Sequence, residues 1–244
     1  MKLPIYIVSD NHFLMKDNQN ESNRRKKLFN LFNKIKQSGG SLIIGGDFFD
    51  FWFEFKNNIP SGYNNILNQL ESLNKHNIDI HYVLGNHDYW DFGFFKQKFG
   101  AYTYKDDFKF TINGKQIIVS HGDGLLKHDY LYRFMKKIIR NKFFIFLFKM
   151  LNKNIACRLA ENISKNSRGF HKDNNLREKE KNELKTYAEH LFNNNIDTVL
   201  LVHYHETGIN KINNNTLIYL GDWIHKFTVT KYSTDKGWQQ IRWS

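Results

Sequence analysis

Side chains that can bind metal ions occur in five short motifs of this 244-residue chain. They combine Asp, Asn and His, which offer an anionic oxygen, a neutral carbonyl oxygen and an imidazole nitrogen. This donor set suits borderline divalent ions such as Mn²⁺, Fe²⁺ or Zn²⁺, and it lacks the thiolates of a structural zinc site. Two such ions, ~3.5–4 Å apart and bridged by a carboxylate, can convert a bound water into a hydroxide. They can also stabilise the attacking and the leaving oxygen when that hydroxide displaces a group from phosphorus. The motifs are Asp10-Asn11-His12, Gly46-Asp47 with Asp50, Gly85-Asn86-His87-Asp88, His121-Gly122-Asp123 and His203-Tyr204-His205.

Each motif directly follows a predicted strand. Apolar runs at residues 3–9, 41–45 and 79–84 alternate with helical spacing of apolar residues at 24–37 and 66–73. Because the carboxyl ends of strands in an α/β sheet meet at one edge, we expect the motifs to converge there. The predicted fold class is α/β, with two sheets packed face to face and helices outside. Further strands are predicted at 198–202, 216–220, 227–231 and 238–242, and a hairpin at 108–120, where Asn113-Gly114 favours a type I′ turn.

Positive charge is concentrated in one segment. The net charge is +12, and residues 125–172 contain twelve Lys or Arg against two Asp or Glu. Within this segment, residues 143–151 form a dense apolar run that is too short to span a bilayer. Such a basic, aromatic-rich helix suits a membrane interface, a pocket for acyl chains or the buried core of a cap. We therefore predict a core of residues 1–124 and 173–244, with a helical, basic and apolar lid at 125–172.

Composition excludes several classes of protein. Hydrophobic residues make up 41% of the chain, which is enough for a buried core. A single cysteine, Cys157, excludes an internal disulfide and fits a reducing compartment. The apolar run at the N-terminus is too short for a signal peptide, and no stretch approaches the roughly 20 apolar residues of a membrane-spanning helix. We expect a cytoplasmic monomer.

The order of the five motifs resembles the calcineurin-like metallophosphoesterase superfamily over residues 10–205. This resemblance implies a β-sandwich flanked by helices and two metal ions bridged by Asp47. It also implies that His87 contacts the phosphoryl group or protonates the leaving group, and that Asp50 orients His87. On the same resemblance, Asp10, His12, Asp47 and His205 would bind the first ion, and Asp47, Asn86, His121 and His203 the second.

The segment after His121 is similar to the lid of one family within this superfamily, the UDP-2,3-diacylglucosamine pyrophosphatases of lipid A biosynthesis. The similarity lies in HGDGLLKHDYLYRFMKKIIRN, the apolar run and RLAENISKNSRGF. It implies hydrolysis of the lipid-linked UDP-sugar to 2,3-diacylglucosamine 1-phosphate and UMP by a hydroxide activated by two Mn²⁺ ions. It also implies peripheral contact with the cytoplasmic face of the inner membrane. The substrate contacts that it implies are Asn86, His87, Asp129, Tyr132, Lys165, Ser167, Arg168 and His203.

An alternative is a phosphodiesterase acting on nucleotides or nucleic acid with the same metals, since basic charge also suits nucleic acid. The dense apolar run argues against this alternative, because nucleic-acid grooves use single interleaved aromatics. No nucleic-acid partner is therefore expected. A binding scaffold without activity would have lost metal ligands, yet every expected ligand position is occupied by a competent residue.

Overall fold

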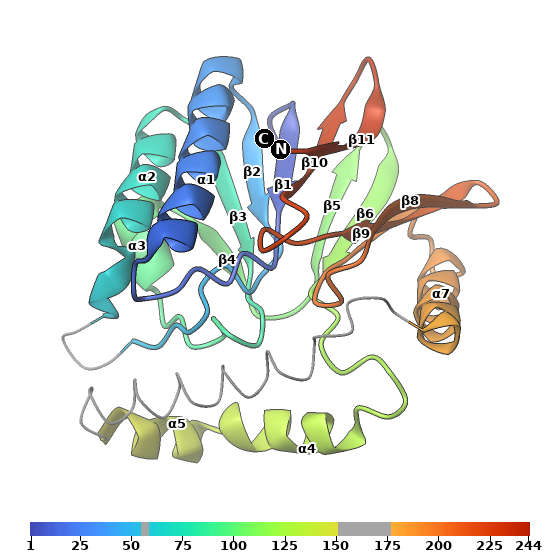
Figure 1. The fold of residues 1–244 in the computed structure, drawn as a ribbon. Helices are drawn as coiled ribbons and strands as arrows, with labels where there is room; N and C mark the ends of the chain where they lie inside the picture. Colours follow the sequence, from blue (N-terminus) through green and yellow to red (C-terminus); the bar gives the residue numbers. More distant parts are fainter. Residues whose placement is uncertain (55–58, 151–176) are drawn as a thin grey trace.

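The computed structural model describes residues 1–54, 59–150 and 177–244 (Figure 1). Within these residues two β-sheets pack face to face, with helices on their outer faces, which confirms the predicted α/β sandwich. The first sheet contains six of the described strands. Strands β1 to β4 are parallel to one another, and β10 pairs antiparallel with both β1 and β11. In spatial order they are β11 (Gly237–Arg242), β10 (Thr228–Ser233), β1 (Ile5–Val8), β2 (Ser41–Ile44), β3 (Asp79–Val83) and β4 (Tyr102–Tyr104).

The second sheet contains five of the described strands, of which β6, β7 and β9 are parallel. The predicted hairpin forms its edge, and positive φ angles of 49° at Asn113 and 77° at Gly114 agree with the type I′ turn. The opposite edge is a strand that the sequence analysis missed. In spatial order the strands are β5 (Phe108–Ile112), β6 (Lys115–Ser120), β7 (Thr198–Leu201), β9 (Asn215–Leu220) and β8 (Thr207–Ile212).

The core has three layers of apolar contact. Alternate residues of the central strands, such as Ile7 and Ile43, face Val119 and Leu200 of the other sheet between the two layers. The other faces of these strands pack against helices, so the strands are buried on both sides and are almost wholly apolar, apart from the first residues of β2 and β7, Ser41 and Thr198. Helices α1 (Gln19–Ser38), α2 (Asn64–Lys75) and α3 (Phe94–Phe99) cover the first sheet, and α7 (Glu178–Phe192) covers the second.

Helix α1 shows why helix starts are hard to place from sequence. Its apolar residues lie at the predicted spacing, but it begins at Gln19, five residues before the predicted start. The side chain of Asn18 accepts a hydrogen bond of 3.0 Å from the amide of Glu21 and so caps the helix. The first turn is polar, so hydrophobic spacing alone could not reveal it.

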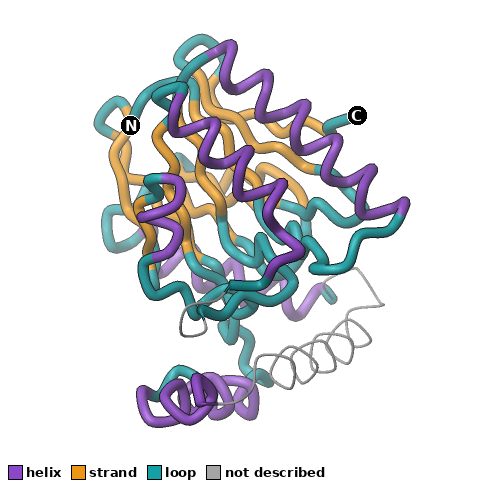
Figure 2. The backbone as a smooth tube through the Cα atoms, turned by 90° about the vertical axis from the view of Figure 1, so that its left-hand side faces the viewer, coloured by secondary structure: helices purple, strands orange, loops and turns teal. Residues whose placement is uncertain are grey.

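Two helices of the predicted lid, α4 (Tyr130–Ile139) and α5 (Lys142–Met150), lie beneath the sandwich, at the end where the parallel strands finish (Figures 1 and 2). The described helices are all too short or too polar to cross a membrane. The division into a core and a lid at residues 124 and 173 stays a prediction. Cys157 and three predicted substrate contacts, Lys165, Ser167 and Arg168, lie outside the described residues.

Candidate active site

Seven predicted metal donors meet where five strands end: β1, β2 and β3 of one sheet, and β6 and β7 of the other. The backbone turns sharply there, with positive φ at five of the donors. Asp, Asn and His tolerate this left-handed region better than most residues. The strained positions are Asp10 (46°), His12 (43°), Asp47 (51°), His203 (68°) and His205 (53°).

Asp10 is held so that one carboxylate oxygen faces two imidazoles. Its Oδ2 accepts a hydrogen bond of 3.1 Å from the amide of His203. Its buried Oδ1 lies 3.9 Å from Nε2 of His12 and 3.8 Å from Nε2 of His205. Among the described residues no donor lies within hydrogen-bond distance of this oxygen. A buried carboxylate oxygen without a donor is costly, and a cation between it and the two imidazoles would compensate it.

Asp47 is held in the same way between two groups of histidines. Its Oδ1 accepts a hydrogen bond of 2.8 Å from the amide of His87. Its Oδ2 lies 3.8 Å from Nε2 of His12 and 3.4 Å from Nε2 of His121. One oxygen therefore faces donors of both predicted metal positions, which fits the bridging carboxylate of a two-metal site.

The ring of His121 is oriented by the main chain. Its Nδ1 lies 3.1 Å from the carbonyl oxygen of Gly45, and a carbonyl can only accept, so Nδ1 carries a hydrogen. Its Nε2 then faces Oδ2 of Asp47 and, at 3.1 Å, Oδ1 of Asn86. A nitrogen that faces two acceptors needs a proton or a metal ion between them. Asn86 thus lies at the predicted second metal position.

The pKa shifts of the donor residues support the same two metal positions. Burial lowers the pKa of His121, but the Asp47 carboxylate outweighs this effect and raises the pKa to about 10. Burial opposes ionisation of Asp47, but the charges of His121 and His87 hold its pKa well below the usual value. Burial, aided by His87, lowers the pKa of His12 well below its usual value. His12 is therefore neutral, as a metal ligand must be. The proton on His121 lies where a metal ion would bind.

Comparison with known proteins agrees with this geometry. The sequence profile described as calcineurin-like phosphoesterase matches residues 3–207. The chain belongs to this family. It is therefore a metal-dependent hydrolase, and its donor groups fit divalent ions.

Several similar proteins bear the name UDP-2,3-diacylglucosamine hydrolase. The one from Porphyromonas gingivalis is 26% identical over 69% of this chain and 64% of its own length. The one from Histophilus somni is 26% identical over 90% of this chain and 95% of its own. Among solved structures, that of an archaeal phosphodiesterase is 15% identical, with a TM-score of 0.50 over 98% of this chain and 99% of that chain. This last similarity shows a shared fold.

In this phosphoesterase His87 contacts Asp50, but through the main chain. Nδ1 of His87 lies 2.7 Å from the carbonyl oxygen of Asp50. This contact uses the main chain of Asp50, so it survives a change of the Asp50 side chain. The hydrogen on Nδ1 leaves Nε2 as the ring nitrogen that can exchange a proton with a substrate. The catalytic roles of both residues stay predictions.

Asp222, at the end of β9, is a supporting residue that the sequence analysis missed. Its Oδ2 lies 4.0 Å from Nδ1 of His205. Its Oδ1 accepts hydrogen bonds from three successive main-chain amides, of Ile224, His225 and Lys226, at 2.8, 2.6 and 3.0 Å. These bonds fix a carboxylate beside His205. The signal was present, because Gly221-Asp222 follows β9 as Gly46-Asp47 follows β2.

Asp88 and Gly85 shape the loop that carries Asn86 and His87. The buried carboxylate of Asp88 accepts hydrogen bonds from the amides of Phe48 and Gly85, at 2.8 and 2.7 Å, and from the hydroxyl of Tyr82 at 2.6 Å. A Cβ at Gly85 would lie 2.1 Å from Oδ1 of Asp47. The loop can therefore approach Asp47 only because residue 85 has no side chain.

The two predicted substrate contacts of the described lid differ in position. Tyr132 lies at the site, with its ring centroid 6.3 Å from that of His203 and its hydroxyl 2.7 Å from Oδ2 of Asp123. Asp129 closes the turn before α4, since its carboxylate accepts from the amide of Leu126 at 3.3 Å. Their contacts with a substrate stay predictions.

Proposed function

We propose that this phosphoesterase cleaves the pyrophosphate bond of UDP-2,3-diacylglucosamine, giving 2,3-diacylglucosamine 1-phosphate and UMP. The observation that supports this proposal is that the donor cluster follows the strand ends on the side of the sandwich where α4 and α5 lie, and these two helices carry exposed apolar side chains (Figure 1). Leu131 and Phe134 of α4 are 67% and 65% exposed, and Phe143 of α5 is 69% exposed. A substrate with acyl chains next to its phosphates needs such a surface. The names of the similar proteins point to the same substrate.

The proposed chemistry combines bound metals with side chains of this chain. Two Mn²⁺ ions, when bound, would polarise a phosphoryl oxygen and lower the pKa of a water. His87, oriented by Asp50, would contact the phosphoryl group or give a proton to the leaving phosphate. Tyr132, next to His203, would position the substrate from the lid side.

Contact with the inner membrane is part of the proposal. One side of α5 packs on the core, where the ring centroids of Phe148 and Phe53 are 4.7 Å apart. The other side carries exposed apolar residues next to the exposed Lys142, while Lys149 lies at the border with the core, with its Nζ 3.7 Å from the centroid of the Phe92 ring. An amphipathic surface with cations suits the boundary of an anionic membrane, where acyl chains enter. We propose that α4 and α5 contact the cytoplasmic face of that membrane while the protein remains monomeric.

One experiment separates this proposal from the nucleic-acid alternative. The full chain with Mn²⁺ is incubated with UDP-2,3-diacylglucosamine, with bis-p-nitrophenyl phosphate and with single-stranded DNA. The proposal expects UMP from the first substrate at the highest kcat/KM, and no activity after chelation. Preferential cleavage of DNA would replace the lipid assignment with the alternative. Full activity in metal-free buffer would contradict both. His121→Ala, which removes a predicted ligand, should be folded and inactive.

A further inference from the structure

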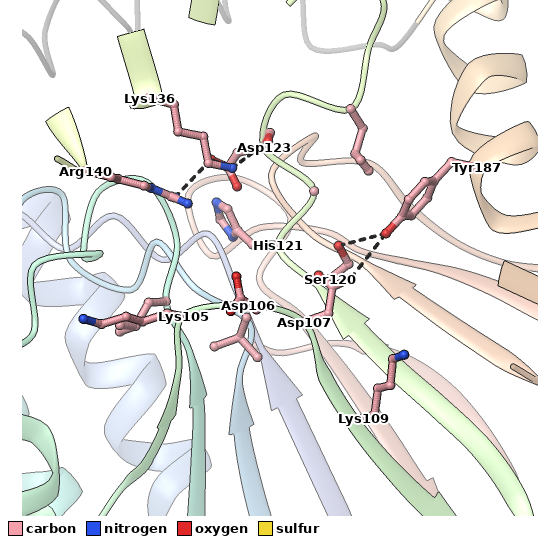
Figure 3. Close-up of a pocket in the computed structure, with 14 residues that line it drawn as sticks. Lys105, Asp106, Asp107, Lys109, Ser120, His121, Asp123, Lys136, Arg140 and Tyr187 are labelled. Carbon is pink, nitrogen blue, oxygen red and sulfur yellow. Dashed lines mark hydrogen bonds and ion pairs between the residues drawn. The ribbon is translucent and has the colours of Figure 1, made fainter. Parts of the chain in front are cut away.

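A cavity of about 450 Å³ opens beside the metal-donor cluster. His121 and Gly122 form part of its wall, and His121 is one member of the donor group that also contains Asp47 and His203. Other parts of the wall come from α4, from α7 and from the segment that leads into β5 (Figure 3). Much of this lining is charged or hydroxylic, which distinguishes it from the exposed apolar residues of α4 and α5.

We infer that this cavity binds the nucleoside monophosphate half of the substrate. The inference rests on the proposed function, because a lipid-linked nucleoside diphosphate sugar has an apolar half and a polar half on either side of the bond that is cut. The exposed side chains of α4 and α5 suit the acyl chains. The cavity, on the side toward α7, offers the charges and hydroxyl groups that a ribonucleotide needs.

One wall of the cavity suits a phosphate. Nζ of Lys136 and the guanidinium of Arg140 lie 2.7 and 3.3 Å from the same oxygen of Asp123. Lys has three N–H donors and Arg has five, more than one carboxylate oxygen can accept, so donors and net positive charge remain for an anion. The guanidinium also stacks 3.9 Å from the centroid of Tyr89, which fixes its plane.

The other wall suits a ribose and a base. The hydroxyl of Tyr187 lies 3.4 Å from Oδ2 of Asp107 and 3.5 Å from Oγ of Ser120. A carboxylate is the group that nucleotide sites use to accept a hydrogen bond from the ribose 2′-hydroxyl. The ring of Tyr187, with Leu125, adds an apolar surface for a base. Figure 3 shows His121 between this wall and the Lys136 and Arg140 wall, so a nucleotide that spans them places its phosphate near the metal donors.

Nucleotide binding to the Mn²⁺-loaded full chain tests the inference. Calorimetry is carried out with UMP and with 2′-deoxy-UMP, which differ only in the hydroxyl that Asp107 would accept. We expect UMP to bind about tenfold more tightly, and Asp107→Ala to remove this preference. Asp235→Ala, at an exposed carboxylate in the turn between β10 and β11, should keep it. Equal binding of the two nucleotides, no binding of UMP, or a preference that survives Asp107→Ala would each overturn the inference.

Two further measurements keep the outcomes distinct. Because Asp107 is exposed, Asp107→Ala should melt at the wild-type temperature, so any lost preference reports on binding. Hydrolysis of UDP-2,3-diacylglucosamine is measured on the same wild-type preparation. Hydrolysis without a ribose preference would reject the nucleotide subsite and retain the proposed function. A ribose preference that depends on Asp107, without hydrolysis of the lipid substrate, would retain the subsite and reject the lipid assignment.

Discussion

The main-chain carbonyl oxygen of Asp50 lies 2.7 Å from Nδ1 of His87. This contact places a hydrogen on Nδ1 of His87 and leaves Nε2 without one, and it uses the main chain of Asp50. His87→Ala should therefore lower kcat for the UDP-sugar by about 10²–10⁴-fold, the range for loss of a proton donor. Asp50→Asn keeps the carbonyl and should lower kcat by less than about tenfold.

The leaving group provides the check on His87. p-Nitrophenolate departs without protonation, so the loss of kcat in His87→Ala should be much smaller with bis-p-nitrophenyl phosphate than with the UDP-sugar. Equal losses with both substrates would show that His87 acts on the phosphoryl group or on metal binding instead of donating a proton. A loss in Asp50→Asn as large as that in His87→Ala would show that the carboxylate matters.

Gly85 should be essential for metal binding although it offers no donor atom. A Cβ at this position would lie 2.1 Å from Oδ1 of Asp47 and 2.7 Å from Cε1 of His121. Gly85→Ala should therefore displace the bridging carboxylate and weaken Mn²⁺ binding by about tenfold or more. The control is Gly114→Asn in the β5–β6 turn, where the space is open and Asn tolerates the positive φ. The affinities are measured by titration with Mn²⁺. If Gly85→Ala and Gly114→Asn both bound Mn²⁺ as tightly as the wild type, the prediction would be contradicted.

Metal binding should release a proton from His121. Asp47 raises the pKa of this ring to about 10, so it is protonated at neutral pH, whereas a metal ligand must be neutral. Because His121 must lose this proton, the affinity for Mn²⁺ should rise about tenfold for each pH unit between about pH 7 and 8.5. Calorimetry in buffers of different ionisation enthalpy should show about one proton released per site. Affinity that does not change with pH would place His121 outside the metal site.

The apolar side chains of α4 and α5 should mediate binding to anionic lipid vesicles. Phe134→Ser with Phe146→Ser should weaken sedimentation with such vesicles by about tenfold or more, because each change removes an aromatic ring from the interface. Tyr102→Ser is the matched control, since Tyr102 is 59% exposed, like Phe146, but lies on the edge strand β4. Unchanged sedimentation of the double variant would contradict membrane contact through these helices.

The sequence allowed the fold class and the donors to be predicted because both depend on local pattern. The apolar strands of the core end at Asp, Asn or His, and parallel strands end at one edge. Asp222 was missed although Gly221-Asp222 repeats the pattern of Gly46-Asp47, because only the pairing of β7 with β9 brings its carboxylate next to His205. Strands β4 and β8 were missed because they are edge strands with partly exposed residues and little alternation. The main-chain partners of His87 and His121 exist only after folding, so no residue pattern could reveal them.

The left-handed backbone at five donor positions, Asp10, His12, Asp47, His203 and His205, limits how this centre can change its metal preference. A thiolate or a longer carboxylate there would need a residue type that rarely adopts this conformation. This backbone conformation therefore favours Asp, Asn and His at these five positions. Selection for a softer or harder ion is least constrained at Asn86 and His121, and at residues that contact a ligand, as Asp222 contacts His205.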